Sequence, residues 1–267
     1  MFRRLLVLFI LSVSLYANNI STYLYSYYLP INFVDNKLKH NGFDVIGSYH
    51  PMQNDKYTVL VITSNELKDL ASKDGREFAG VLKVLIDDEN KRIVVSNPEY
   101  FLRAFLQDDF NKQNADKITQ SLKRIFPNIK NSKYSLDEND ISEYHFMFAM
   151  PYYEDKIEVA SGNNLNNKII TNASKNIVFS LKLNNNATLY GVSMNGSLGE
   201  EYYLNAIEQK KHSVLLPYMV LVKNNKAYIL HPKYYLAVSL PALSMGEFMT
   251  ISDIPGEIED YFKSLFQ

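Results

Sequence analysis

Two short stretches of the sequence place a histidine two residues before a methionine. They are His145 and Met147 in YHFMFAM, and His50 and Met52 in YHPM. An imidazole and a soft thioether together suit copper, and on a strand His145 and Met147 would share a face. Both pairs also fit a packing role, because methionine fills irregular gaps in protein cores. The four residues are therefore candidate copper ligands, while a chain without any cofactor is the expected case.

The other residues with chemical potential form no recognisable catalytic pattern. Neighbouring acids such as Asp87-Asp88-Glu89 and Glu200-Glu201 are typical of solvated turns, whereas a general acid or base needs burial that shifts its pKa. No nucleophile elbow, phosphate-binding loop or dinucleotide fingerprint occurs. The chain has no cysteine, which excludes disulfides and thiolate chemistry. We predict no catalytic residues, and an enzyme is the less favoured class.

One phrase occurs twice, as SNPEYFLRAFL (96–106) and LHPKYYLAVSL (230–240). The copies lie 232 − 98 = 134 residues apart, about half of the 267-residue chain. Each is expected to form a short helix or tight turn that locks a hairpin end against the last helix of its half. The signature residues, with a structural role, are Pro98, Tyr100, Leu102, Pro232, Tyr234 and Leu236.

The elements around the phrase recur in the same order. A β-hairpin precedes each copy, at 81–98 and 217–232, and an amphipathic helix closes each half, at 115–126 and 256–266. The sequence therefore predicts a tandem duplication and an α+β fold of two related domains. Each would be a mainly antiparallel sheet with helices on one face, and the two would pair about a pseudo-two-fold axis in a monomer.

The expected boundaries follow from this repeat. Domain 1 spans 18–127, a polar linker spans 128–143, and a more divergent domain 2 spans 144–267. Domain 2 should begin with one or two strands within 144–160.

The N-terminus has the layout of a secretory signal peptide. Arg3 and Arg4 precede an apolar run from Leu5 to Leu15, and cleavage is expected after Ala17. An uncleaved anchor is the alternative, although the run is shorter than the about 20 residues that span a bilayer. No later segment is apolar enough to cross a membrane, so a periplasmic location is predicted. A net charge of −1 offers no electrostatic case for nucleic acid.

The first half resembles the DUF302 family, a bacterial domain of unknown function. The resemblance rests on LKHNGFDVIGSYH (38–50) and REFAGVLKVLIDDENKRIVVSNP (76–98), and it covers about residues 20–126. It implies an α+β fold with dimer-like pairing, and it supplies no catalytic residues. The second half lacks a pair like Gly42-Phe43. Its similarity to the family rests only on the internal repeat.

These observations favour an exported, non-enzymatic binding protein. Its partner would be a small ligand in a groove between the halves or a protein of the envelope. An enzyme or a copper-handling protein with a site at the inter-domain cleft is the alternative. A scaffold with a flat, exposed tyrosine face is a third possibility.

Overall fold

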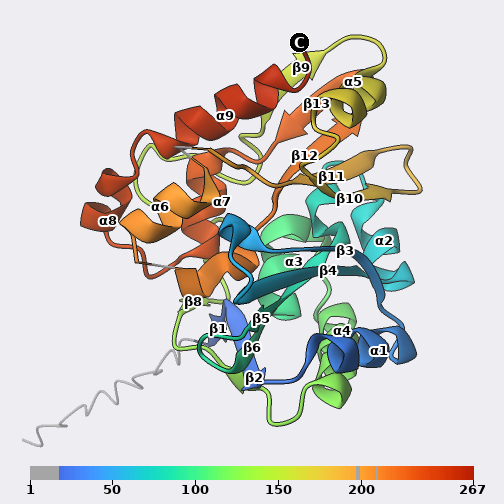
Figure 1. Ribbon diagram of the computed structural model, residues 1–267, viewed down its shortest axis with the longest axis vertical. Coiled ribbons are helices and arrows are strands. Elements are labelled where there is room, and N and C mark those ends of the chain that lie inside the picture. The colour runs from blue at the N-terminus through green and yellow to red at the C-terminus, as the bar shows by residue number, and fades with distance from the viewer. Residues whose placement is uncertain (1–17, 197–198, 209) are drawn as a thin grey trace, which may run out of the picture.

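The described part of the chain contains two large antiparallel sheets and one two-stranded sheet, flanked by helices (Figure 1). This computed structural model describes residues 18–196, 199–208 and 210–267. The predicted signal peptide and its cleavage after Ala17 lie outside the described residues. None of the helices in the described ranges is long and apolar enough to cross a membrane. The predicted α+β class is confirmed.

The first sheet contains six strands in the order β3-β4-β5-β6-β2-β7, and every neighbouring pair is antiparallel. Its strands are β2 (Tyr23–Tyr27), β3 (Asp44–Tyr49), β4 (Tyr57–Thr63), β5 (Leu82–Asp87), β6 (Arg92–Ser96) and β7 (Lys130–Asn131). Strands β4 and β5 are buried along their whole length. Both faces of the sheet centre are therefore covered, which suits their dense β-branched sequences.

Helices pack beside this sheet, and three of the four begin at a side-chain cap. They are α1 (Ile31–His40), α2 (Asn65–Ala71), α3 (Pro98–Leu106) and α4 (Lys112–Ile125), with short 3₁₀ turns η1 (Pro51–Gln53), η2 (Glu77–Gly80) and η3 (Gln107–Asp109). The Ser64 hydroxyl caps α2, and the Asn97 and Asn111 side chains cap α3 and α4.

The second sheet contains five strands in the order β10-β11-β12-β13-β9, again antiparallel throughout. Its strands are β9 (Ile157–Ser161), β10 (Ile177–Lys182), β11 (Thr188–Val192), β12 (Tyr218–Lys223) and β13 (Lys226–Ile229). The helical elements are α5 (Leu165–Asn172), α6 (Glu200–Ala206), η4 (Lys210–Leu215), α7 (Pro232–Ser239), α8 (Met245–Thr250) and α9 (Ile254–Ser264).

The two sheets share their strand order. The order β3-β4-β5-β6-β2 corresponds in sequence order to β10-β11-β12-β13-β9. Both first hairpins carry an irregularity at the same place, between Val45 and Gly47 in one and between Ile177 and Phe179 in the other. The same bulge in the same strand is a specific feature, since bulges re-aim a strand locally.

The segment between the halves has its own structure. It contains β7, which pairs with β2, and β8 (Ser135–Asp137), which pairs with β1 (Asn19–Ser21). Residues 144–156 contain no helix or strand, so of the predicted strands in 144–160 only β9 forms. His145 and Met147 therefore lie in a loop, and the argument that placed them on one face of a strand is wrong.

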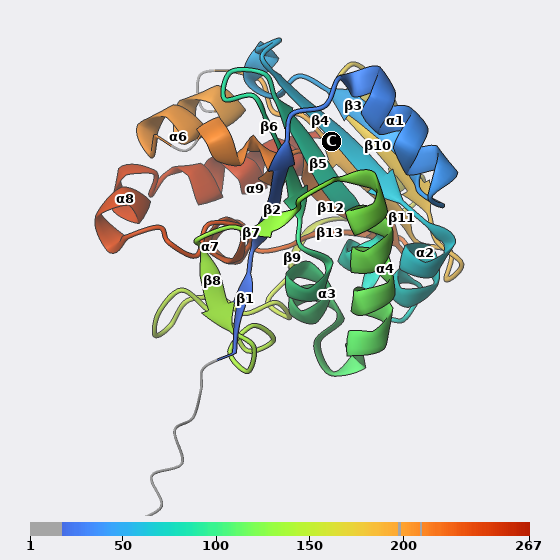
Figure 2. The same ribbon diagram turned by 90° about the horizontal axis from the view of Figure 1, so that it is seen from below.

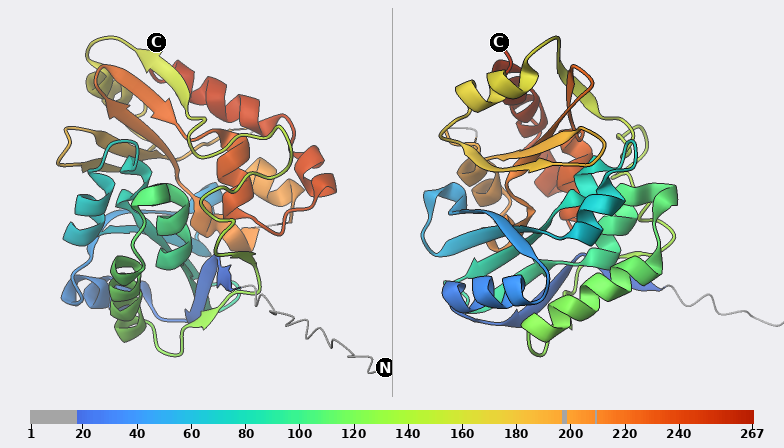
Figure 3. Two further views of the ribbon diagram at one scale, coloured as in Figure 1. Left: turned by 180° about the vertical axis from the view of Figure 1, so that it is seen from behind. Right: turned by 90° about the vertical axis from the view of Figure 1, so that its right-hand side faces the viewer.

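The two sheets meet at their first strands and along the turns beside them. Strand β3 runs close to β10, and a Cβ added to Gly47 would lie 2.7 Å from the Val178 carbonyl oxygen. Turn η4 packs on β4, β5 and β6, while η2 packs on β11 and β12. Figures 2 and 3 show the two layers in close contact from several sides. The buried residues of both halves form one hydrophobic cluster.

Candidate functional site

The four copper candidates lie at two different places in the fold. The ring nitrogen Nδ1 of His50 lies 3.1 Å from the Tyr57 carbonyl oxygen. Met52 is buried in η1. The His145 ring packs at a tilt against Tyr152, with their ring centroids 4.4 Å apart, and Met147 is exposed. Among the described residues, no group of three or more His, Cys, Asp or Glu side chains is arranged to hold a metal.

The repeated phrase forms the same local structure in both halves. Pro98 and Pro232 stand in the first turn of α3 and α7, where a missing N–H costs no hydrogen bond. The residue before each proline caps the helix with its side chain: Asn97 accepts from the Glu99 N–H, and His231 accepts from the Lys233 N–H. Leu102 and Leu236 are buried.

The two phrase tyrosines instead reach across to the other half. The Tyr100 hydroxyl donates to the Val238 carbonyl oxygen at 2.8 Å. The Tyr234 hydroxyl donates to the Ala104 carbonyl oxygen at 3.3 Å. Both tyrosines are fully buried, so the bonds form away from water.

A lysine that the sequence analysis did not single out lies buried at the contact between the halves. Lys83, on β5, donates to three oxygens: the carbonyls of Leu215 and Pro217 (2.8 Å) and the Tyr235 hydroxyl (2.8 Å). Burial lowers the pKa of Lys83 well below its usual range, and the negative charge of Glu200 opposes this shift only in part. Three acceptors match the three N–H groups of an ammonium ion, so the geometry favours the charged form that burial disfavours.

Glu200 is the second buried ionisable group at this contact. Its carboxylate accepts from the N–H of Met194 (3.2 Å), from the N–H of Met52 (3.3 Å) and from the Tyr49 hydroxyl (3.3 Å). Burial raises the pKa of Glu200 to about 7, against these hydrogen bonds and the charge of Lys83. The expectation that Glu200-Glu201 is a solvated acidic pair is therefore wrong for Glu200.

Glu77 and Lys223 connect the halves at another point. The Lys223 ammonium lies 2.6 Å from Glu77 Oε1, which also accepts from the Asn185 side chain at 2.9 Å. Lys223 makes a further ion pair with exposed Asp74. Glu77 is buried and belongs to η2, whereas Lys223 and Asn185 belong to the second half. These contacts hold η2 on the second sheet.

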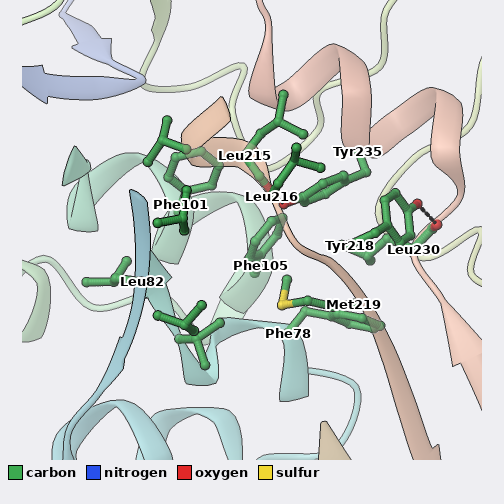
Figure 4. Packing of buried hydrophobic residues seen from close by; sticks show 14 of the residues in the cluster. Phe78, Leu82, Phe101, Phe105, Leu215, Leu216, Tyr218, Met219, Leu230 and Tyr235 are labelled. Atoms are coloured by element: carbon green, nitrogen blue, oxygen red, sulfur yellow. Dashed lines mark hydrogen bonds between the residues drawn. The ribbon is translucent and has the colours of Figure 1, made fainter. Parts of the chain in front are cut away.

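A buried amine close to an acid with a raised pKa is also what an active site contains. Here the Lys83 donors are all engaged by the protein's own groups. The cavity beside Lys83 has a volume of about 20 Å³, enough for one water molecule. Figure 4 shows the surrounding space filled by apolar side chains of both halves, including Phe101, Phe105 and Met219. The arrangement joins the halves and leaves no room for an organic substrate.

Larger hollows lie on the outside of each half. One of about 630 Å³ is lined by residues of the first half and the segment after it, among them Asn97, Lys112 and Lys130. Another of about 380 Å³ is lined mainly by asparagines between α5 and the hairpin turns of the second half. Both are open and polar, and neither lies between the halves.

An exposed apolar surface lies where the 144–156 loop meets α8. Phe146 stacks on Phe248 of α8, with their ring centroids 4.9 Å apart, so the two segments are in contact. Both segments carry exposed apolar side chains, and Phe148 is 93% exposed. We call the following residues the Met-Phe patch: Met147, Phe148, Tyr152, Met245 and Met249.

The sequence offered a signal for part of this surface that the prediction did not use. Helix α8 lies in a segment for which no helix was predicted. It opens with a capping box, in which Ser244 and Glu247 bond each other's backbone N–H, and Ser-x-x-Glu is a recognisable helix start. The exposure of Phe148 had no sequence signal, because an aromatic-rich run also fits a buried strand.

Comparison with known proteins gives no relative for this chain. No family model, no curated protein and no solved structure matches it.

Proposed function

We propose that this chain is an exported, non-enzymatic binding protein that recognises a protein partner through the Met-Phe patch. The observation that carries the proposal is the exposure of Phe148 and of four other apolar side chains on two segments that contact each other. Folded proteins rarely leave large apolar side chains together in water unless the surface is used. Aromatic and methionine side chains are also the types enriched where proteins bind each other.

The buried ionisable groups support recognition over catalysis. Lys83, Glu77 and Glu200 each bond groups of the opposite half. Their role in joining the halves leaves the outer surface as the place for function.

We also propose that the halves derive from one duplicated DUF302-like domain, with domain 1 at 18–127, a connecting segment at 128–143 and domain 2 at 144–267. The shared strand order and the shared bulge support this. On this proposal the Met-Phe patch is specific to domain 2, because α8 stands where domain 1 has only the short turn η3. Export to the periplasm rests on the N-terminal sequence.

Copper handling is a second candidate, and one observation favours it. The contact between Phe146 and Phe248 brings the segment with His145, Met147 and Met150 next to the segment with Met245 and Met249. Thioether and imidazole ligands suit Cu(I). Competition with a chromogenic Cu(I) chelator tests it: a Met245→Leu, Met249→Leu variant should lose any Cu(I) binding that the native chain shows.

Site-specific photo-crosslinking in the source cells tests the main proposal. A benzophenone amino acid replaces Phe148 in one variant and Tyr27 in another, since Tyr27 is an exposed aromatic on β2, outside the patch. We expect a discrete adduct of higher mass from position 148 only. The adduct should disappear when Met245 and Met249 are both changed to serine. No adduct from position 148, or the same adducts from both positions, would contradict the proposal.

A further inference from the structure

The two segments that carry the Met-Phe patch are rich in carboxylates. Residues 138–156 and 244–257 together carry eight carboxylates and one lysine. Lys156 and Arg76 pair with Glu154, and Arg103 pairs with Glu138, so these two acids are already compensated. The acids are Glu138, Asp140, Glu143, Glu154, Asp155, Glu247, Asp253 and Glu257.

Several of these acids are available to a partner. Asp140, Glu143, Asp253 and Glu257 are exposed, and none of them forms an ion pair with a residue that the structure describes. An apolar centre with uncompensated carboxylates at its rim is complementary to a segment that has apolar and basic faces.

The apolar centre suits the side chains of a helix. Met245 and Met249 stand four residues apart on α8, so they share one face of that helix, and both are exposed. Unbranched methionine side chains adapt to differently shaped apolar partners. The capping box at Ser244 fixes the start of α8, and the Phe146–Phe248 stack fixes the loop against it. These contacts hold helix α8 and the loop in place, while the exposed methionine side chains can adapt to the shape of a partner.

We propose that the Met-Phe patch binds a basic amphipathic helix of a partner protein. The apolar face of that helix would lie on Phe148 and the methionines, and its lysines or arginines would face the surrounding carboxylates. This inference rests on the proposed function and adds the chemistry of the partner. A lipid surface fits less well, because bacterial membranes are anionic and the rim would repel them.

Two synthetic peptides test the charge preference directly. Both have about 18 residues, or five helical turns, with the same leucine stripe, and the polar face is lysine in one and glutamate in the other. Fluorescence anisotropy measures their binding to the purified protein. We expect the lysine peptide to bind at least about tenfold more tightly, with an affinity that falls as salt rises.

Substitutions assign the binding to the patch. Phe148→Ser should weaken binding of the lysine peptide about tenfold, as loss of a central anchor does. Glu143→Lys should also weaken it and reduce its salt dependence. The matched control is Glu66→Lys on α2, which lies far from α8 in Figure 1 and should leave the affinity unchanged.

The contrary outcomes are separable. Equal binding of both peptides, or equal effects of Glu143→Lys and Glu66→Lys, overturns the inference. Co-sedimentation with vesicles of phosphatidylethanolamine and phosphatidylglycerol (three to one) that Phe148→Ser abolishes also overturns it, since a lipid surface is then the occupant. If neither peptide binds but the position-148 crosslink forms, this inference fails and the proposed function stands. If both are absent, both fail.

Discussion

Tyr100 and Tyr234 exchange hydrogen bonds between the two halves at equivalent positions. The tyrosines are 234 − 100 = 134 residues apart, and the carbonyls that they reach, at Ala104 and Val238, are 238 − 104 = 134 residues apart. Val238, which accepts from Tyr100, is therefore the counterpart in the second half of Ala104, which accepts from Tyr234. This reciprocity is the pattern of a two-fold contact, in which residue i meets j and j meets i. It gives the repeated phrase a physical purpose.

Removing either hydroxyl should destabilise the protein. Tyr100→Phe and Tyr234→Phe each keep the ring and remove one buried hydrogen bond between the halves, at a cost of about 1 kcal/mol. Tyr234→Phe should cost less, because the Ala104 carbonyl keeps the Gln107 side-chain amide as a donor. Urea unfolding followed by fluorescence and circular dichroism measures this. If the halves unfold together, each variant shifts a single transition seen by both probes. Two separate transitions, with each variant moving only one, would show that the halves unfold independently.

Lys83→Met should destabilise the protein strongly. The substitution keeps most of the side-chain volume but leaves the Pro217 and Leu215 carbonyls and the Tyr235 hydroxyl without the ammonium. Leaving buried neutral oxygens without a donor costs about 1–3 kcal/mol, and the Leu215 carbonyl still accepts from the Tyr235 hydroxyl. Chemical denaturation measures the loss, and Lys91→Met on the exposed hairpin turn is the control. A loss below about 1 kcal/mol would mean that Lys83 is held as a neutral amine whose bonds contribute little.

Glu200 should make the protein less stable as the pH rises from about 4.5 to 7. Its folded pKa of about 7 lies above the usual value of 4.5, so the folded state binds the proton more tightly. The stabilisation is complete below about pH 4.5 and is lost as the pH rises through 7. The change is at most about 3 kcal/mol.

Glu200→Gln removes the ionisable group and keeps an acceptor for the Met52 or Met194 N–H. The native chain should therefore lose unfolding free energy relative to this variant as the pH rises from 4 to 8. Denaturant titrations at several pH values measure it. A difference that is constant across this range would show that Glu200 does not titrate there.

The parts of the fold that were predictable are those that local patterns determine. The hairpins at 81–98 and 217–232 follow from β-branched runs around polar turns, and Pro98 and Pro232 mark helix starts that the structure confirms. Long-range burial was not predictable. In VLKVLI, Lys83 reads as the solvent-facing residue of an alternating strand, yet the second half covers that face.

The same limit explains the errors around the candidate site. The 144–156 run is rich in aromatic residues, and this composition indicated strands. Pro151 interrupts the run, and the strand order of the sheet leaves it no partner strand. Glu200 looked solvated because its neighbours in sequence are polar. Its environment comes from Met52 and Tyr49, which are about 150 residues away in the chain.

The exposure that supports the Met-Phe patch can be tested by stability alone. Phe148 and Phe248 lie in the two contacting segments, but Phe148 faces solvent whereas Phe248 is buried at 3% exposure. Phe148→Ser should therefore change the unfolding free energy by less than about 0.5 kcal/mol. Phe248→Ser should cost about 3–5 kcal/mol, because it opens a cavity under the Phe146 stack and buries a hydroxyl. Thermal and urea unfolding of both variants decide the matter. Equal losses would mean that Phe148 is packed in solution, and the surface on which the proposed function rests would then be absent.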